Sequence, residues 1–206
     1  MNYQGQAGQD RFVTEMLKFK KNGYFVEIGS HNYKYHNNSY VLETQLDWKG
    51  IMIDSDTTCL EGWKKFRTNS THLCTDATKI DYVELFEMVN MSKDIDYLQI
   101  DLDVNSRSTL DVLENFDKNI LGKYKFATIT FEHDIYTGNF FDTRKISRDV
   151  FKKYGYELVF PDVSTFWLGK ECEFEDWWVH PDLVDMDFVN KVRKNKSVNG
   201  KSISYN

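Results

Sequence analysis

The sequence predicts an α/β protein built on a mostly parallel sheet with helices on both faces. Short apolar runs typical of buried strands alternate with segments of helical periodicity, which is the order expected of a doubly wound fold. Four of these runs end in an acidic residue, at Glu27, Asp54, Asp101 and Glu132. Open sheets of this kind bind ligands at the carboxyl ends of their strands, so the four acids predict one shared site.

The composition is that of a single globular domain. A chain of 206 residues is long enough for a sizeable core, and an aromatic content of 16% supplies apolar area to fill it. A formal net charge of −6 disfavours a non-specific nucleic-acid binder, which is usually basic. The three cysteines, Cys59, Cys74 and Cys172, lack metal-ligand spacing, so we expect reduced thiols and a cytoplasmic protein. No apolar run approaches the length of a membrane span, and we expect no secretory leader.

The first predicted helix covers residues 11–20, where apolar residues recur at helical spacing. The first predicted strand, residues 24–28, has four apolar residues in a run of five, as a central strand covered on both faces requires. Gly29 then allows a tight turn. The polar loop 30–38 leads into a second predicted helix at residues 39–48.

The next segment repeats the alternation of strand and helix. Trp48-Lys49-Gly50 turns the chain into the second predicted strand, residues 51–54, and a helix is predicted at residues 57–66. A short third strand at residues 72–75 precedes a helix at residues 82–89. Each strand and the helix after it form a unit typical of a parallel sheet.

Two further strands and two helices follow in the same order. The fourth predicted strand, residues 95–101, leads to an amphipathic helix at residues 109–116. The fifth strand, residues 126–132, is followed by a helix at residues 143–154. No internal repeat, linker or low-complexity segment interrupts the pattern.

The chain is predicted to close with a hairpin, a short helix and a tail. The hairpin joins residues 156–160 to residues 165–168 across Pro161-Asp162 and adds an antiparallel edge to the sheet. From about Lys194 the tail is polar and basic, and we expect it to be frayed.

The spacing of two residues suggests a nucleoside site. Asp54 lies 25 residues after Gly29, and an acid near this distance commonly accepts hydrogen bonds from both ribose hydroxyls. Asp76 either binds an adenine amine or caps the helix that follows. The dinucleotide-binding motif is absent, because only one of its three glycines is present.

Several motifs, taken in order and spacing, resemble the FkbM-like family of S-adenosylmethionine-dependent O-methyltransferases. The motifs are Gly8-Gln9-Asp10, Gly23 to Gly29, Trp48 to Asp54, Ile100-Asp101-Leu102-Asp103, Phe131-Glu132 and Phe174 to Trp178. The match extends to about residue 182. It implies a Rossmann-like class I methyltransferase fold with a seven-stranded, mostly parallel sheet and an antiparallel C-terminal hairpin, in one domain at residues 1–194 followed by a tail at residues 195–206.

The resemblance implies S-adenosylmethionine as the cofactor and a sugar or glycan hydroxyl as the acceptor. Asp54 would bind the ribose, and Asp76 with Ala77 would bind the adenine. The implied cofactor-binding residues are Gln9, Asp10, Glu27, Gly29, Ser30, Asn38, Asp54, Asp76, Ala77 and Asp101. This sequence departs from the family at Ser30-His31-Asn32, which replaces a glycine-richer loop, and at Asp54, where a glutamate followed by proline is common.

Some sugar-modifying relatives hold a divalent metal at the ends of the fourth and fifth strands. By this resemblance the predicted ligands of Mg²⁺ or Mn²⁺ are Asp101, Glu132 and His133. A bound metal would lower the pKa of a sugar hydroxyl, and Asp103 would be the general base, with His133 as the alternate. Two plainer interpretations stay open: Asp103 as a helix cap, and His133 as an ordinary loop histidine.

The predicted acceptor-binding residues are Asn105, Asp134, Tyr136 and Arg144. Arg148 is expected only to support a helix surface, and Trp177-Trp178 either stacks on a sugar or packs in the core. Two other functions remain open, a nicotinamide-dependent oxidoreductase and a non-catalytic module that keeps the fold. An independent enzyme and one domain of a larger glycan-processing protein are both compatible with the sequence.

Overall fold

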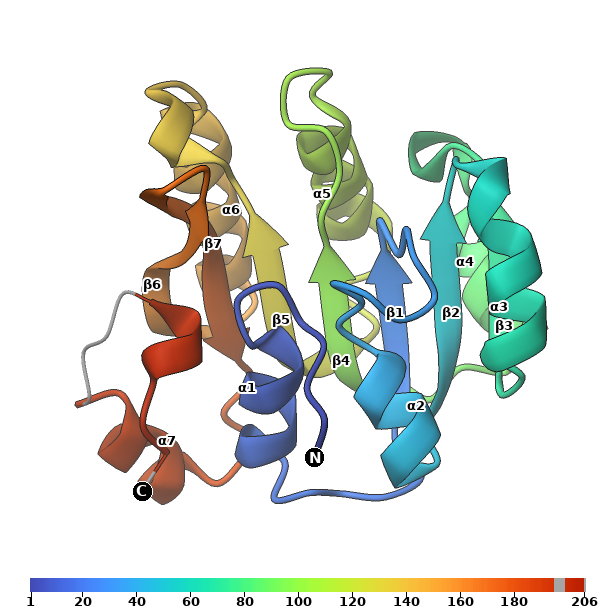
Figure 1. The fold of residues 1–206 in the computed structure, drawn as a ribbon, viewed down its shortest axis with the longest axis horizontal. Helices are drawn as coiled ribbons and strands as arrows, with labels where there is room; N and C mark the ends of the chain where they lie inside the picture. The colour runs from blue at the N-terminus through green and yellow to red at the C-terminus, as the bar shows by residue number, and fades with distance from the viewer. Residues whose placement is uncertain (195–198, 206) are drawn as a thin grey trace.

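The computed structural model describes residues 1–194 and 199–205. They contain a seven-stranded sheet in the order β3-β2-β1-β4-β5-β7-β6 (Figure 1). Strands β1 to β5 are parallel, and β7 runs antiparallel to both β5 and β6. The strands are β1 (Tyr24–Ile28), β2 (Lys49–Asp54), β3 (Ser70–Cys74), β4 (Asp94–Ile100), β5 (Lys125–Glu132), β6 (Glu157–Trp167) and β7 (Lys170–Val179). The predicted fold class is therefore confirmed.

Helices cover both faces of the sheet (Figure 1). One face packs against α4 (Tyr82–Met88), α5 (Ser108–Asn119) and α6 (Phe141–Lys153). The other packs against α1 (Gln9–Met16), α2 (Tyr40–Leu46), α3 (Leu60–Phe66) and α7 (Met186–Val192). Short 3₁₀ helices are η1 (Thr57–Cys59), η2 (Ala77–Lys79), η3 (Ile135–Thr137) and η4 (Gly200–Ser202). None of the described helices is long and apolar enough to cross a membrane.

Strand β1 shows why its sequence is apolar almost throughout. Val26 and Ile28 belong to the core under α4, α5 and α6, whereas Phe25 belongs to the core under α1, α2 and α3. Successive side chains of a strand point to opposite faces, so a strand covered on both sides needs apolar residues at every position. Glu27 is the exception, and it shares the α1 and α2 face with Phe25.

The C-terminal hairpin differs from its prediction. Pro161-Asp162 is not its turn but lies inside β6, where the pairing with β7 shifts register between Phe160 and Val163. A β-bulge accepts proline because the residue there needs no ladder hydrogen bond. The chain reverses instead at Leu168-Gly169, both of which have positive φ.

The C-terminal residues 199–205 are packed, so the expected fraying is wrong for them. Ile203 and Tyr205 are buried in the core of the α1 face, and the Tyr205 ring meets Phe160 edge-on. Gly200 approaches the N-terminal segment so closely that a Cβ there would lie 2.3 Å from the carbonyl oxygen of Ala7. The rest of the predicted tail, residues 195–198 and 206, lies outside the described residues.

Candidate active site

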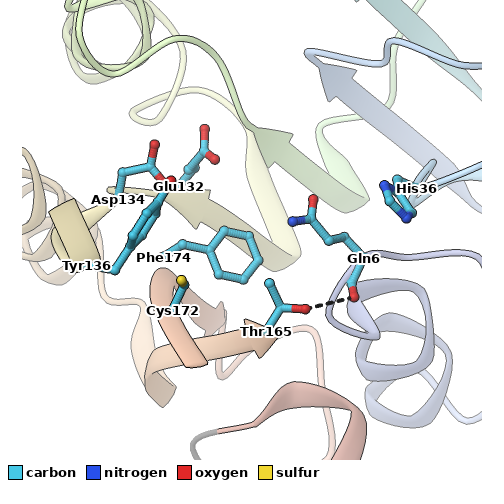
Figure 2. Close-up of a pocket in the computed structure, with 8 residues that line it drawn as sticks. All are labelled: Gln6, His36, Glu132, Asp134, Tyr136, Thr165, Cys172 and Phe174. Atoms are coloured by element: carbon cyan, nitrogen blue, oxygen red, sulfur yellow. Dashed lines mark hydrogen bonds between the residues drawn. The ribbon is translucent and has the colours of Figure 1, made fainter. Parts of the chain in front are cut away.

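The carboxyl edge of the sheet carries two cavities, one on either side of the end of β4. The first, about 340 Å³, lies at the ends of β2, β3 and β4, and we call it the β2–β4 cavity. Its lining residues are Asp54, Ser55, Thr75, Asp76, Ala77, Leu102, Asp103, Ser106 and Ser108. The second, about 280 Å³, is the β5–β7 cavity, lined by Gln6, His36, Glu132, Asp134, Tyr136, Thr165, Cys172 and Phe174 (Figure 2).

The β2–β4 cavity brings together three of the predicted cofactor-binding residues, Asp54, Asp76 and Ala77. The Asp54 carboxylate accepts hydrogen bonds from the backbone N–H of His31 at 2.8 Å and of Asp56 at 2.9 Å. Asp76 caps η2 through one oxygen, which accepts from Thr78 N and Oγ1 at 2.9 and 2.7 Å. One Asp76 oxygen therefore serves the helix cap, and the second has no such bond among the described residues.

Glu27 orders the loop after β1. One of its oxygens accepts from the backbone N–H of Asn38 and Ser39, both at 3.0 Å, and the other accepts from Asn37 Nδ2 and Ser39 Oγ at 2.9 and 2.8 Å. Burial raises the pKa of Glu27, and the fully buried Arg67 opposes this rise. Because loop donors occupy both oxygens, Glu27 acts on a cofactor through the loop that it holds.

Gly29 and Ser30 are fixed by neighbouring strands. Gly29 has a φ of 88°, and a Cβ there would lie 1.7 Å from the carbonyl oxygen of Asp101. The Ser30 hydroxyl donates to Glu27 O at 2.9 Å and accepts from Ile53 N at 3.2 Å. Only glycine fits at position 29, because the backbone of Asp101 passes too close to leave room for a side chain.

Three other residues predicted to bind the cofactor, Gln9, Asp10 and Asn38, form hydrogen bonds with other residues of the protein. Asp10 accepts from the backbone N–H of Gln4 and Gly5 and so folds the N-terminal segment over α1, whose N-cap is Gly8. Gln9 Nε2 donates to Glu175 Oε1 at 2.9 Å. Asn38 Nδ2 donates to Gln99 Oε1 at 2.6 Å, while its Oδ1 is buried without a partner among the described residues.

Four acids gather where the ends of β4 and β5 meet the middle of β7. We call Asp101, Glu132, Asp134 and Glu175 the open acid cluster. Glu132 and Glu175 lie directly opposite each other in the β5–β7 pairing, an arrangement that is destabilising when both are ionised. Glu175 is fully buried and accepts from Gln9 and from Trp177 Nε1 at 2.7 Å. No arginine or lysine forms an ion pair with these four acids in the described part of the chain.

Burial raises every pKa in the open acid cluster, and the charge of Asp101 adds to the rise in the other three acids. Burial, followed by the charge of Asp101, raises the pKa of Glu175 to about 8 and that of Asp134 to about 6. The same two causes raise the pKa of Glu132 well above its usual value. Burial also raises the pKa of Asp101, but a hydrogen bond from Glu132 opposes this. Within this pair the pKa of Glu132 is raised more strongly than that of Asp101, so a proton bound to the pair favours Glu132.

His133 follows Glu132 directly and enters a different group of side chains. We call His133, Arg144, Arg148, Asp162 and Asp176 the paired acid cluster. His133 Nε2 lies 3.5 Å from Asp176 and 3.6 Å from Asp162. Arg148 donates to both acids at 2.7–2.8 Å, and Arg144 donates to Asp162 at 2.9 Å.

The arginines hold the acids of the paired cluster in their ionised form. Burial favours a higher pKa for Asp176, but hydrogen bonds from Arg148 and the nearby His133 outweigh it and lower the pKa of Asp176 to about 2. Asp176 is as deeply buried as Glu175 in the open cluster. The pKa values of Glu175 and Asp176 shift in opposite directions because Arg148 contacts Asp176 and does not contact Glu175.

These contacts correct two sequence-based assignments and leave a third as a prediction. The metal-ligand set Asp101, Glu132 and His133 is not assembled, because His133 faces Asp162 and Asp176 rather than Asp101. Arg144 forms an ion pair with Asp162 and is 27% exposed, so its contact with an acceptor stays a prediction. The sequence predicts that Arg148 only supports a helix surface, but it donates to both oxygens of the fully buried Asp176.

The predicted general base Asp103 lies in an exposed loop after β4. It accepts from the Asn105 backbone N–H at 3.0 Å and from Asn105 Nδ2 at 3.3 Å. Burial slightly raises its pKa, but hydrogen bonds from Ser106 and Asn105 outweigh this and lower it. Asp103 lines the β2–β4 cavity rather than the β5–β7 cavity, and Asn105 is hydrogen-bonded to it.

Glu175 lies in the Phe174 to Trp178 motif, and the sequence predicts no role for it. It is the third glutamate of an alternation that begins with the exposed Glu171 and Glu173, so no local signal distinguishes it. Asp134 and Tyr136, both predicted to bind the acceptor, do line the β5–β7 cavity. Figure 2 shows them with Glu132 on one side of this cavity, opposite Gln6 and His36, with the Phe174 ring between.

Comparisons with known proteins identify the fold. No protein-family profile and no curated protein sequence matches the chain. A TehB-like SAM-dependent methyltransferase from Corynebacterium glutamicum is similar over 87% of this chain and 89% of its own, with 14% identity and a TM-score of 0.53. A precorrin-6y C5,15-methyltransferase from Geobacter metallireducens is similar over 82% and 86%, with 12% identity and a TM-score of 0.53.

The METTL16 methyltransferase domain extends this likeness to a third protein. It is similar over 82% of this chain and 65% of its own, with 9% identity and a TM-score of 0.56. At sequence identities this low, the similarity shows a shared fold and does not show a shared function. The chain has the Rossmann-like fold of class I methyltransferases.

Proposed function

We propose that this protein is an S-adenosylmethionine-dependent O-methyltransferase that acts on a sugar or glycan hydroxyl. The fold likeness supports methyl transfer, and the resemblance to the FkbM-like family supports the choice of acceptor. The observation that carries the proposal is the pair of partly buried acids Asp101 and Glu132, with which no arginine or lysine of the described chain forms an ion pair. This pair stands at the ends of β4 and β5, between a cavity suited to a nucleoside and a second cavity.

The β2–β4 cavity would hold the adenosine part of the cofactor. The Asp54 carboxylate supplies the acceptor oxygens that a ribose diol needs, and Asp76 retains one oxygen for an exocyclic amine. Gly29 lets the backbone after β1 pass beside Asp101, and Glu27 holds the loop above it. These residues orient the cofactor, and none of them takes part in proton transfer.

When bound, S-adenosylmethionine supplies an activated methyl group, whose C–S bond breaks as the new C–O bond forms. A sugar hydroxyl is a weak nucleophile and must lose its proton during the attack. In our proposal the ionised carboxylate of Asp101 accepts this proton, and the hydrogen bond from Glu132 stabilises that carboxylate beforehand. Holding the two reactants in adjacent cavities contributes through proximity and orientation.

The donor set does not fit the predicted metal. Among the described residues, Asp101, Glu132 and Asp134 do not bring one ligand atom each within 4.8 Å of one another. His133, Asp162 and Asp176 do converge, but arginines already donate to both acids. We therefore route no step through a metal, and we expect turnover to survive EDTA.

The test begins with binding. S-Adenosylhomocysteine should raise the melting temperature and NAD should not; stabilisation by NAD alone would contradict the proposal and favour an oxidoreductase. Methyl transfer from labelled S-adenosylmethionine to a panel of sugars and glycans, with and without EDTA, then tests the acceptor class. Transfer to RNA but to no carbohydrate would contradict the sugar assignment, and EDTA-sensitive transfer would restore a metal.

A further inference from the structure

A third cavity lies beside the β5–β7 cavity and differs from it in charge. This N-terminal cavity, about 310 Å³, is lined by Tyr3, Gln4, Gly5, Gly8, Arg11, Tyr35, His36 and Lys201. His36 lines both cavities, so the two are neighbours across one side chain. A ligand that enters the β5–β7 cavity can therefore extend past His36 into the N-terminal cavity.

The cations of the N-terminal cavity are not neutralised by the residues that line it. Arg11, Lys201 and the titratable His36 line the cavity, and none of its lining residues is acidic. Neither Arg11 nor Lys201 forms an ion pair with an acid in the described chain. Two acids of α1 offset them in part: buried Asp10 accepts from backbone N–H groups, and Glu15, one turn after Arg11, interacts with its charge without forming an ion pair. This lining stands out in a protein whose net charge is −6.

Packing holds the Arg11 side chain in place and fixes the backbone beside Lys201. The Arg11 guanidinium lies 5.0 Å from the centre of the Tyr205 ring, on which it stacks. Lys201 follows Gly200, whose tight contact with Ala7 fixes the C-terminal segment against the start of α1. A cation that is already ordered loses less entropy when it binds an anion.

The aromatic residues of the cavity suit a carbohydrate. Tyr35 is 64% exposed, and with the Lys34 ammonium 5.5 Å from its ring centre it leaves one ring face for stacking. The Tyr3 hydroxyl is hydrogen-bonded to Thr14 Oγ1 at 3.1 Å, which orients that ring. Two tyrosines beside two cations can recognise a sugar that bears a negative charge.

We propose that the N-terminal cavity is a subsite for an anionic substituent of the acceptor sugar, such as a carboxylate, phosphate or sulfate. The open acid cluster disfavours an anion near the reacting hydroxyl, so the charge has to lie at the far end of the acceptor. Arg11 binds it as a planar two-pronged donor and Lys201 as a point charge. This inference rests on the proposed function for the identity of the acceptor.

The experiment measures equilibrium binding in the presence of S-adenosylhomocysteine. The probes are methyl β-glucuronide, glucose 6-phosphate, glucose 6-sulfate and uncharged methyl β-glucoside, titrated into the full-length protein. The charged probes should bind more tightly than the glucoside, and their rank order distinguishes the three substituents. Arg11→Gln and Lys201→Gln should each weaken the charged probes about tenfold and leave the glucoside unchanged.

Controls separate this subsite from the fold and from the proposed function. Lys118→Gln, an exposed lysine on α5, should change no affinity, and Arg11→Lys should restore part of the binding if Arg11→Gln disturbs Tyr205. Equal affinity for charged and neutral probes, or variants that bind like the wild type, would overturn the subsite even if methyl transfer occurs. Tighter binding of a 5′-phosphorylated oligonucleotide than of any sugar would also overturn it. Selective binding of the charged sugars without any methyl transfer would support the subsite and remove the proposed function.

Discussion

Two consecutive residues at the end of β5 enter groups of acids that behave in opposite ways. Glu132 joins the open acid cluster, where carboxyl groups meet without arginine or lysine and their pKa values rise. His133 joins the paired acid cluster, where Arg148 holds the pKa of Asp176 near 2. Both clusters contain a fully buried acid. Burial alone therefore does not decide whether an acid is reactive, and the presence of a contacting arginine does.

The difference separates a chemical role from a structural one. An acid that an arginine neutralises cannot readily accept a proton at neutral pH, but it can hold β6, β7 and α6 together. An acid that is buried without a cation has a pKa nearer to neutrality, where proton transfer is most efficient. The following predictions test this division, and the largest expected effect comes first.

Asp101→Asn should reduce methyl transfer by roughly 10²- to 10⁴-fold, the range typical for loss of a general base. The amide keeps the size of the side chain but cannot accept the proton. Single-turnover kinetics at saturating cofactor measure the effect, and calorimetry should show nearly unchanged affinity for S-adenosylhomocysteine. The matched variant in the other cluster, Asp162→Asn, should retain most of the rate per folded molecule. Equal losses in both variants would remove the distinction between the clusters.

Arg148→Ala should lower the free energy of unfolding by about 3 kcal/mol, because it leaves Asp176 buried without its partner. Urea denaturation measures this change. Lys145→Ala is the matched control on α6, since Lys145 and Asp149 form an exposed pair that contributes about 0.5 kcal/mol or less. If both variants unfold at the same urea concentration, the paired cluster does not stabilise the fold.

Asp54→Asn should weaken binding of S-adenosylhomocysteine about tenfold, the cost of one hydrogen bond to a charged group. The rate at saturating cofactor should stay close to that of the wild type, because Asp54 lies outside both acid clusters. Asp56→Asn alters an acid in the same loop that does not line the cavity and serves as the control. A loss of rate without a loss of affinity would move Asp54 from cofactor binding to chemistry.

The two clusters should also respond to pH in opposite directions. The pKa of Glu175 is about 8 in the folded protein and near 4.5 in the unfolded chain, so its contribution to stability is present at low pH and is lost as pH rises through 8. Asp176, with a pKa of about 2, contributes above its unfolded value near 3.8 and loses that contribution as pH falls through 2.

Melting curves of the wild type and Glu175→Gln between pH 5 and 9 check the first half of this expectation. The difference in melting temperature should shift in favour of the variant by a few degrees as pH rises, because glutamine carries no charge at any pH. An amide that faces Gln9 and Trp177 adds a constant offset, so the slope is the measured quantity. A difference that does not depend on pH would mean that Glu175 is ionised throughout.

The sequence located the carboxyl edge well because that signal is local. An apolar run that ends in an acid can be recognised from a few neighbours, and the acids at Asp54, Asp101 and Glu132 do stand at strand ends along one edge. Which of them is neutralised depends on contacts that are distant in sequence. Arg148 reaches Asp176 from α6, 28 residues earlier, and no local pattern reveals this pair.

The same limit explains the errors at the C-terminus. Pro161-Asp162 resembles a turn locally, and only the register of β7 shows it to be a bulge. The tail is polar in composition, and its order depends on two apolar residues, Ile203 and Tyr205, that meet a distant core. The predicted metal ligands failed for a related reason, because adjacent residues at the end of a strand point to opposite sides.

The packed C-terminal segment sets a practical limit for anyone who shortens this protein. A chain cut at Lys194, the boundary that the sequence favours, would lose the contacts of the Tyr205 ring with the Phe160 ring and the Arg11 guanidinium. It would also uncover Trp177 beside Gly200. The cut would also delete Lys201 from the mouth of the N-terminal cavity. Shortened variants and C-terminal affinity tags should therefore keep residues 199–205 intact, so that an effect of the cut is not mistaken for a property of the intact protein.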